Sequence, residues 1–272
     1  MKESNVLRLS LFLALLVFAA CLAGIVDNSL YQDGEWFRAQ YFGQDVVTLL
    51  VVLPLLLISA RHGLDKNITA WKLIFIAALL YLVYVYAIFV LVASFSPLYF
   101  LHLPIFSLSL FMLISLMGCF FISRRKILLP GRKLRLFSAL YLLLLSGMLS
   151  YLWISDLLKH TFFPEHQSAT PDGEPLLIVY SLDLGVMIPL MLIGVFGLFR
   201  NQTRGIAWAG IMLAKSFLLG FALLGMSVSM FVLGQESDPF LMGLWSVISF
   251  IGVALTALYM NSLVDAMPEG KA

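Results

Sequence analysis

Two charged side chains stand inside long apolar runs of this sequence. Asp183 lies six residues into the run 177–199, and Lys215 lies nine residues into the run 206–233. If these runs are helices that cross a bilayer, a rise of about 1.5 Å per residue places Asp183 roughly 9 Å below one surface. Lys215 then lies near the midplane, where a charge costs about 2.5–3.5 kcal/mol and normally has a partner. We therefore expect the two side chains to be able to meet between adjacent antiparallel helices.

Three interpretations of this pair are open. In the first, the two charges neutralise each other and fix how their helices pack. In the second, they hold a small ligand or an ion, an interpretation that stands beside the first because buried ion pairs are often no more stabilising than apolar pairs of the same volume. In the third, the two side chains never meet.

Two polar residues at the start of another apolar run are candidates for the same site. Asp45 begins the run 44–60, and Thr48 follows one turn later. Both are predicted to line an entrance to the site from the outer side of the membrane.

Two tyrosines in the run 73–95 complete the candidate set. Tyr81 and Tyr84 are three residues apart and therefore share one face of a helix. Hydroxyl groups at that depth need partners, which Asp183 or Lys215 would supply. A role in packing or at the membrane interface is the alternative.

Other chemistries lack their residue patterns. The histidines show no HExxH motif and no paired spacing on a helix, so neither a metal site nor a cofactor is predicted. A retinal Schiff base at Lys215 is disfavoured because another full apolar run follows that residue. An enzyme acting on lipid or quinone is the least favoured class because no nucleophile is paired with a base.

The elements that position these residues are apolar helices. The chain of 272 residues is 61% hydrophobic and 12% charged with a mean hydropathy of +0.99, whereas soluble domains carry about 25% charged residues. A run of about 20 apolar residues crosses a bilayer as a helix. We therefore predict an all-α membrane protein that forms a single transmembrane domain over 1–272. Eight spans are expected, at 7–27, 44–60, 73–95, 99–123, 135–155, 177–199, 206–233 and 240–262.

Basic residues are distributed unevenly between the two sides of these spans. They concentrate in every second connection, above all in the cluster at 124–135, while the other connections are mainly acidic. The positive-inside rule then predicts that both termini are cytoplasmic. The formal net charge of +2 is too small and too regularly placed for a nucleic-acid partner.

Loop lengths suggest an internal repeat. The halves 1–130 and 131–272 each contain four predicted spans, a longer acidic outer loop and then a very short outer turn. Four spans per half preserve orientation, so the expected arrangement is a 4+4 parallel repeat.

The second span of each half adds a similarity at the level of residues. Asp45 precedes Pro54 in the first half, and Asp183 precedes Pro189 in the second. The spacing from acid to proline differs by three residues between the halves. Each proline removes a helical hydrogen bond near its acid.

Three stretches resemble a family of prokaryotic integral membrane proteins that has no known activity. They are GQDVVTLLVVLPLLL (43–57), SLDLGVMIPLMLIGVFGLFR (181–200) and WAGIMLAKSFLLGFALLGM (208–226). The similarity covers most of the chain. It implies a multi-pass protein of the prokaryotic cell membrane, and it implies no mechanism or site residues.

The leading functional hypothesis is a transporter or small-molecule-binding protein with a polar cavity that opens outward. In it, Asp183 changes protonation or ligand occupancy and Lys215 compensates its charge. The alternative is a membrane assembly or accessory subunit, in which the pair is structural. The expected partners are the lipid bilayer, a small molecule or ion, and either a second copy of the chain or a membrane protein.

Overall fold

The computed structural model of this chain describes residues 3–65, 68–122, 130–163, 165–168, 170–171 and 173–263. In these ranges the regular secondary structure is entirely helical, and eight helical spans are long and apolar enough to cross a membrane. The predicted fold class and number of spans are confirmed. Much of the basic cluster predicted at 124–135 lies outside the described residues. The side at which α1 ends is called the outer side below, following the predicted topology.

Six spans are single helices, and two are interrupted. The single helices are α1 (Glu3–Val26), α4 (Thr69–Leu91), α5 (Tyr99–Ile122), α6 (Arg132–Phe162), α9 (Thr203–Val232) and α10 (Pro239–Ser262). The second span comprises α2 (Glu35–Val47), the π-helical segment η2 (Thr48–Val52), α3 (Leu53–Ala60) and the π-helical segment η3 (Arg61–Asp65). The sixth comprises α7 (Leu177–Leu182), the π-helical segment η4 (Asp183–Met187) and α8 (Ile188–Phe199). A short 3-10 helix, η1 (Asn28–Leu30), follows α1.

Two predicted boundaries were wrong for the same reason. The second span begins at Glu35 instead of Gln44, and the fifth continues to Phe162 instead of ending at residue 155. Both extensions mix polar with apolar residues, so they fall outside the continuous apolar runs, yet they keep a helical face that packs on the bundle or meets solvent. At the start of α2, for example, Ala39 is buried while Glu35 is exposed.

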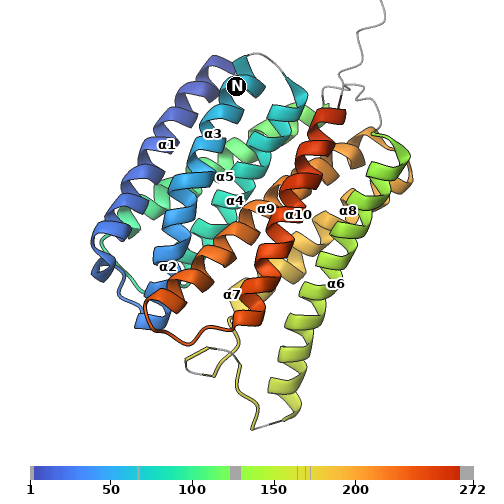
Figure 1. The fold of residues 1–272 in the computed structure, drawn as a ribbon. Helices are drawn as coiled ribbons and strands as arrows, with labels where there is room; N and C mark the ends of the chain where they lie inside the picture. The colour runs from blue at the N-terminus through green and yellow to red at the C-terminus, as the bar shows by residue number, and fades with distance from the viewer. Residues whose placement is uncertain are drawn as a thin grey trace, which may run out of the picture.

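Two helices form the centre of the bundle. Of the eight spans, α4 is the most buried, with 78% of its apolar window inside the protein, and α9 follows with 50%. These helices contact each other, and α9 also packs against α2, α8 and α10. Figure 1 shows α4 and α9 inside the bundle, with α1 and α6 at its margins.

Close glycine contacts hold α9 against its neighbours. Gly43 of α2 touches the backbone of Gly225, and Gly197 of α8 touches the backbone of Gly205. A methyl group at any of these four positions would collide with backbone atoms. Small residues therefore set how near the helices lie, as is usual in membrane bundles.

The two halves of the chain have the same pattern of helix neighbours. In the first half, α1 and α4 each contact both α3 and α5. In the second half, α6 and α9 each contact both α8 and α10. A 4+4 parallel repeat requires this correspondence, and the repeat itself remains a prediction.

The interrupted spans share one local motif. Each contains a five-residue π-helical segment, then one apolar residue, then a proline, which is Pro54 in one span and Pro189 in the other. A proline ring clashes with the carbonyl four residues earlier, and a wider π-turn is one way for the backbone to relieve that clash. Thr48 and Asp183 both begin their π-segments, six residues before the proline. In this register Thr48, not Asp45, corresponds to Asp183.

Candidate functional site

The two charges singled out above lie in the interior of the bundle. Lys215 is in the middle of α9 and is 0% exposed, and Asp183 begins η4 and is 2% exposed. α9 places Lys215 beside the central helix α4, while the π-turn determines the direction in which Asp183 projects. Both side chains are therefore closed to bulk solvent.

Asp183 and Lys215 act on each other electrostatically without direct contact. Lys215 Nζ has no hydrogen-bond partner among the described residues, and neither has Asp183 Oδ1. A direct ion pair was one of the open interpretations, and the side chains of these two residues do not form it. Each charge is left with at least one unused hydrogen-bonding position.

Tyr84 lies beside both charged groups. Lys215 Nζ is 4.3 Å from the centre of the Tyr84 ring, a cation–π contact. Asp183 also acts electrostatically on the hydroxyl group of Tyr84. The structure therefore brings Asp183, Lys215 and Tyr84 together as one group, which we call the central triad.

Tyr81 and Thr48 belong to a separate contact. The Tyr81 hydroxyl lies 3.0 Å from Thr48 Oγ1, and both residues are buried. One face of α4 thus meets the first residue of each π-segment: Tyr81 meets Thr48 of η2, and Tyr84 meets Asp183 of η4.

Trp153 is a partner of Asp183 that sequence reasoning missed. Its indole Nε1 donates a hydrogen bond of 2.9 Å to Asp183 Oδ2. The Trp153 ring stacks on Tyr180, with the ring centres 4.4 Å apart. A tryptophan in an apolar run needs an acceptor for its N–H, and this need was the available signal.

A polar cluster continues from Tyr180 to the outer side. The Tyr180 hydroxyl donates to Asp156 Oδ2 over 2.8 Å. Asp156 also lies 2.9 Å from His166 Nε2 and accepts a hydrogen bond of 2.7 Å from Ser168. Together with Trp153, these residues connect the central triad to the connection between α6 and α7.

Asp45 does not line an entrance. Its side chain is 3% exposed, and its Oδ2 accepts a hydrogen bond of 2.7 Å from the Tyr31 hydroxyl. Gly24 of α1 lies directly against the same oxygen, and Thr48 is only 1% exposed. Neither Asp45 nor Thr48 lines an opening in this structure, because Tyr31 and α1 cover Asp45 and Tyr81 contacts Thr48. Their role in binding a ligand or an ion remains a prediction.

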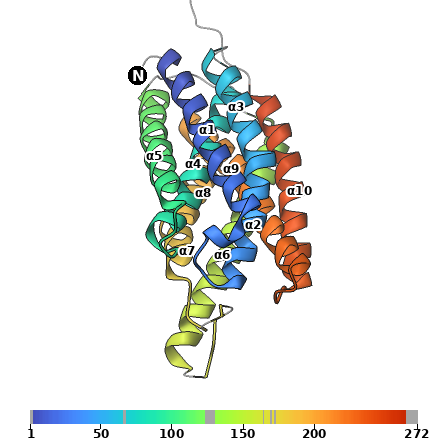
Figure 2. The ribbon, with the colours of Figure 1, turned by 90° about the vertical axis from the view of Figure 1, so that its left-hand side faces the viewer.

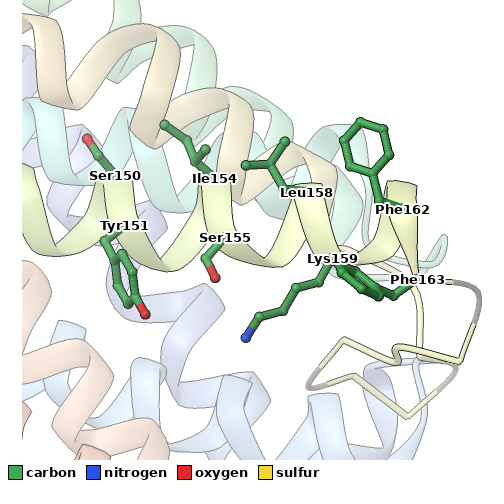
Figure 3. Close-up of a pocket in the computed structure, with 8 residues that line it drawn as sticks. All are labelled: Ser150, Tyr151, Ile154, Ser155, Leu158, Lys159, Phe162 and Phe163. Atoms are coloured by element: carbon green, nitrogen blue, oxygen red, sulfur yellow. The ribbon is translucent and has the colours of Figure 1, made fainter.

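A groove on α6 lies apart from the central triad. It has a volume of about 510 Å³, and all of its lining residues come from α6 and from Phe163 directly after it. Figure 3 shows Ile154, Leu158 and Phe162 along one edge, with Tyr151 and Lys159 on the other side of the helix. A site for a polar solute needs converging polar groups, which this mainly apolar groove lacks.

No group of three metal-binding side chains occurs among the described residues. Comparisons with family models, curated proteins and solved structures find no match. The functional argument therefore rests on the geometry of the central triad and its surroundings.

Proposed function

We propose that this multi-pass membrane protein transports a small polar solute, and that the central triad holds the solute near the middle of the bundle. The observation that carries the proposal is the pair of buried, opposite charges that do not touch, each with an unused hydrogen-bonding position.

A purely structural role explains this arrangement less well. A buried polar group without a partner costs about 1–3 kcal/mol, and a charged one costs more. Two opposite charges whose only task is to fix helix packing gain most when they touch and satisfy each other. Asp183 and Lys215 instead remain apart, with the Tyr84 ring beside them.

The free positions specify the chemistry of the solute. Lys215 offers N–H donors, and Asp183 Oδ1 offers an acceptor. A molecule that fits must present an acceptor to Lys215 and a donor to Asp183. Because the two charges cancel, the site favours a solute without net charge, such as a zwitterion.

Transport also requires a second state in which the site is open. The π-segment η4 is a suitable hinge because π-turns are wider than α-helical turns and commonly occur at functional sites. Within η4, Gly185 is not packed against a neighbouring element, since a methyl group there would meet no atom of another helix within 4 Å. Movement of η4 would carry Asp183 with it and change its distance from Lys215.

Native mass spectrometry of the detergent-purified protein, beside Asp183→Asn and Lys215→Met, tests the proposal. We expect a bound small mass in the wild type that is lost in both variants, and flux of that compound into proteoliposomes that is also lost. Asp238→Asn and Lys159→Met are matched controls, because both side chains are exposed and far along the chain from the triad. Unchanged binding and flux in both folded triad variants would refute the proposal.

An accessory subunit is the second candidate, and one observation favours it. The end of α6 that carries the groove extends beyond neighbouring helices in Figure 2 and exposes Leu158, Phe162 and Phe163. Such a surface suits a membrane partner or a second copy of the chain. Co-purification of one stoichiometric partner, lost in a Leu158→Glu variant, would favour this function.

A further inference from the structure

A second buried carboxyl group lies in the first half of the chain. Asp45 is enclosed by α1, which carries Cys21, and by the turn that contains Tyr31. Cys21 and Tyr31 are themselves almost completely buried, at 0% and 2% exposure. The Tyr31 hydroxyl donates to Asp45 Oδ2 over 2.7 Å. Gly24 packs against the same oxygen and leaves no room for another group at that point.

No cation faces Asp45 among the described residues. The titratable groups around Asp45 and its partner Tyr31 are Cys21 on α1, Tyr41 on α2, Tyr81 and Tyr86 on α4, and His102 on α5. All of them are uncharged in their ordinary state or, in the case of His102, enclosed by aromatic rings.

The surroundings of His102 and Lys215 exclude both as counter-ions. The His102 ring stacks on Phe89 at 4.6 Å and lies 5.5 Å from the Tyr86 ring, and its side chain is 3% exposed. Lys215 is ten residues from Gly225, the α9 residue that touches Gly43 beside Asp45. This separation is about 15 Å along the helix.

A carboxylate without a cation in such a place is strongly disfavoured. Transfer of an isolated ionised carboxylate into an apolar interior costs far more free energy than one hydrogen bond contributes. Such a group therefore binds a proton and becomes neutral. Asp156 provides a contrast, because three side chains, Ser168, His166 and Tyr180, lie within hydrogen-bonding distance of it near the outer surface.

The Tyr31 hydroxyl donates to Asp45, but one such hydrogen bond, which favours the ionised carboxylate, does not offset the cost of burying a charge without a cation. Tyr31 lies outside the spans, and burial raises the pKa of its phenol well above the ordinary value. Tyr31 therefore keeps its proton and remains a donor to Asp45 over the whole physiological range of pH.

We propose that Asp45 is a buried proton-binding site that is occupied in this structure and capped on its outer side by Tyr31. The proposal goes beyond the solute site by assigning a second buried acidic group and its ligand, the proton. It does not depend on the solute site being correct.

Infrared spectroscopy of protein labelled with carbon-13 in its aspartate carboxyl groups tests this proposal. At pH 7 we expect a protonated-carboxyl band that disappears in Asp45→Asn and remains in Asp238→Asn, whose carboxyl group is at the exposed start of α10. In Tyr31→Phe the same band should move to higher frequency, because the carboxyl oxygen loses its hydrogen-bond donor.

If Asp45→Asn fails to fold, the frequency shift of the band in Tyr31→Phe still assigns the band to the carboxyl group of Asp45. A wild-type spectrum at pH 7 without a protonated-carboxyl band that responds to either substitution would overturn the proposal. The infrared spectrum reports the protonation of Asp45, whereas the binding experiment reports the role of Asp183. The two proposals can therefore fail independently.

Discussion

The amine of Lys215 has more unmet hydrogen-bonding capacity than a buried ammonium group usually has. It is fully buried, and its described surroundings provide the face of Tyr84 and the field of Asp183, without a hydrogen bond. Cation–π contacts at desolvated sites are worth about 2 kcal/mol, which is less than the cost of burying a charge. We therefore expect the free-energy cost of burying the Lys215 charge to depend on the nearby charge of Asp183.

The first prediction concerns that dependence. A double-mutant cycle with Asp183→Asn and Lys215→Met should give a coupling free energy of about 0.5–3 kcal/mol, although the two groups do not touch. The double variant should unfold at a higher temperature than the less stable of the single variants, because it leaves no uncompensated charge. Thermal unfolding in detergent, followed by circular dichroism, measures all four proteins. If the free-energy changes of the two single variants add up to that of the double variant, the two charges do not interact.

The second prediction concerns the hydrogen bond from Trp153. Trp153→Phe keeps a ring that stacks on Tyr180 but removes the donor to Asp183. We expect a loss of about 1.5–3 kcal/mol in the free energy of unfolding, the usual contribution of a hydrogen bond to a charged group. Trp36→Phe is the control, since Trp36 is also half-buried and has an aromatic neighbour. Equal losses in the two variants would argue against a special role for Trp153.

At this scale the sequence reveals charges more readily than their partners. Asp183 and Lys215 could be predicted because the cost of a charge in an apolar run does not depend on the fold. Trp153 and Tyr31 could not, because only the packing of distant segments brings them to Asp183 and Asp45.

Among the elements, the π-segments have the most direct bearing on the site. Each begins at the residue that faces α4, and each precedes a proline. The third prediction is that Pro189→Ala lets η4 return to α-helical geometry, which turns Asp183 away from Tyr84. Solute binding should weaken at least tenfold, a change of about 1.4 kcal/mol, while the helix itself becomes more stable.

Pro54→Ala is the matched control for that experiment. It should relax η2 and change the contact between Thr48 and Tyr81, yet leave solute binding intact. Binding measured on both purified variants distinguishes a local effect of η4 from a general effect of proline removal. Equal weakening in both would indicate that the bundle responds as a whole.

The fourth prediction concerns the contact between α2 and α9. Gly43→Ala places a methyl group against the backbone of Gly225, so the two helices must separate. We expect a loss of about 1–3 kcal/mol, the usual cost of overpacking. Gly147→Ala on α6 meets nothing within 4 Å and should raise helix stability by up to about 1 kcal/mol. Unfolding curves in mixed micelles compare the two, and a tolerant Gly43 would contradict the close approach.

Helix number was predictable at this scale, whereas helix ends and π-turns were not. Apolar runs of sufficient length indicate spans directly, but the mixed sequence from Glu35 to Gly43 gives no such signal. The prolines indicated a disturbance in each interrupted span. Only the backbone register shows that Thr48 and Asp183 correspond.

For the molecule as a whole, the polar groups divide between the two halves. Asp45 and its neighbours belong to α1, α2, α4 and α5, whereas Asp183 and Lys215 belong to the second half and lie beside Tyr84 on α4 of the first. On the proposals made above, one half binds a proton and the other a solute, with α4 between them. The eight-span architecture could be predicted from hydropathy, but this division depends on tertiary contacts.

The projecting outer end of α6 has a practical consequence for imaging. The 31 residues of the helix correspond to roughly 46 Å, compared with a hydrocarbon core of about 30 Å. The outer end of α6 extends beyond the neighbouring helices as one continuous helix (Figure 2). An antibody fragment raised against that extension would supply the asymmetric mass that electron cryo-microscopy needs to align single particles, without touching the interior of the bundle.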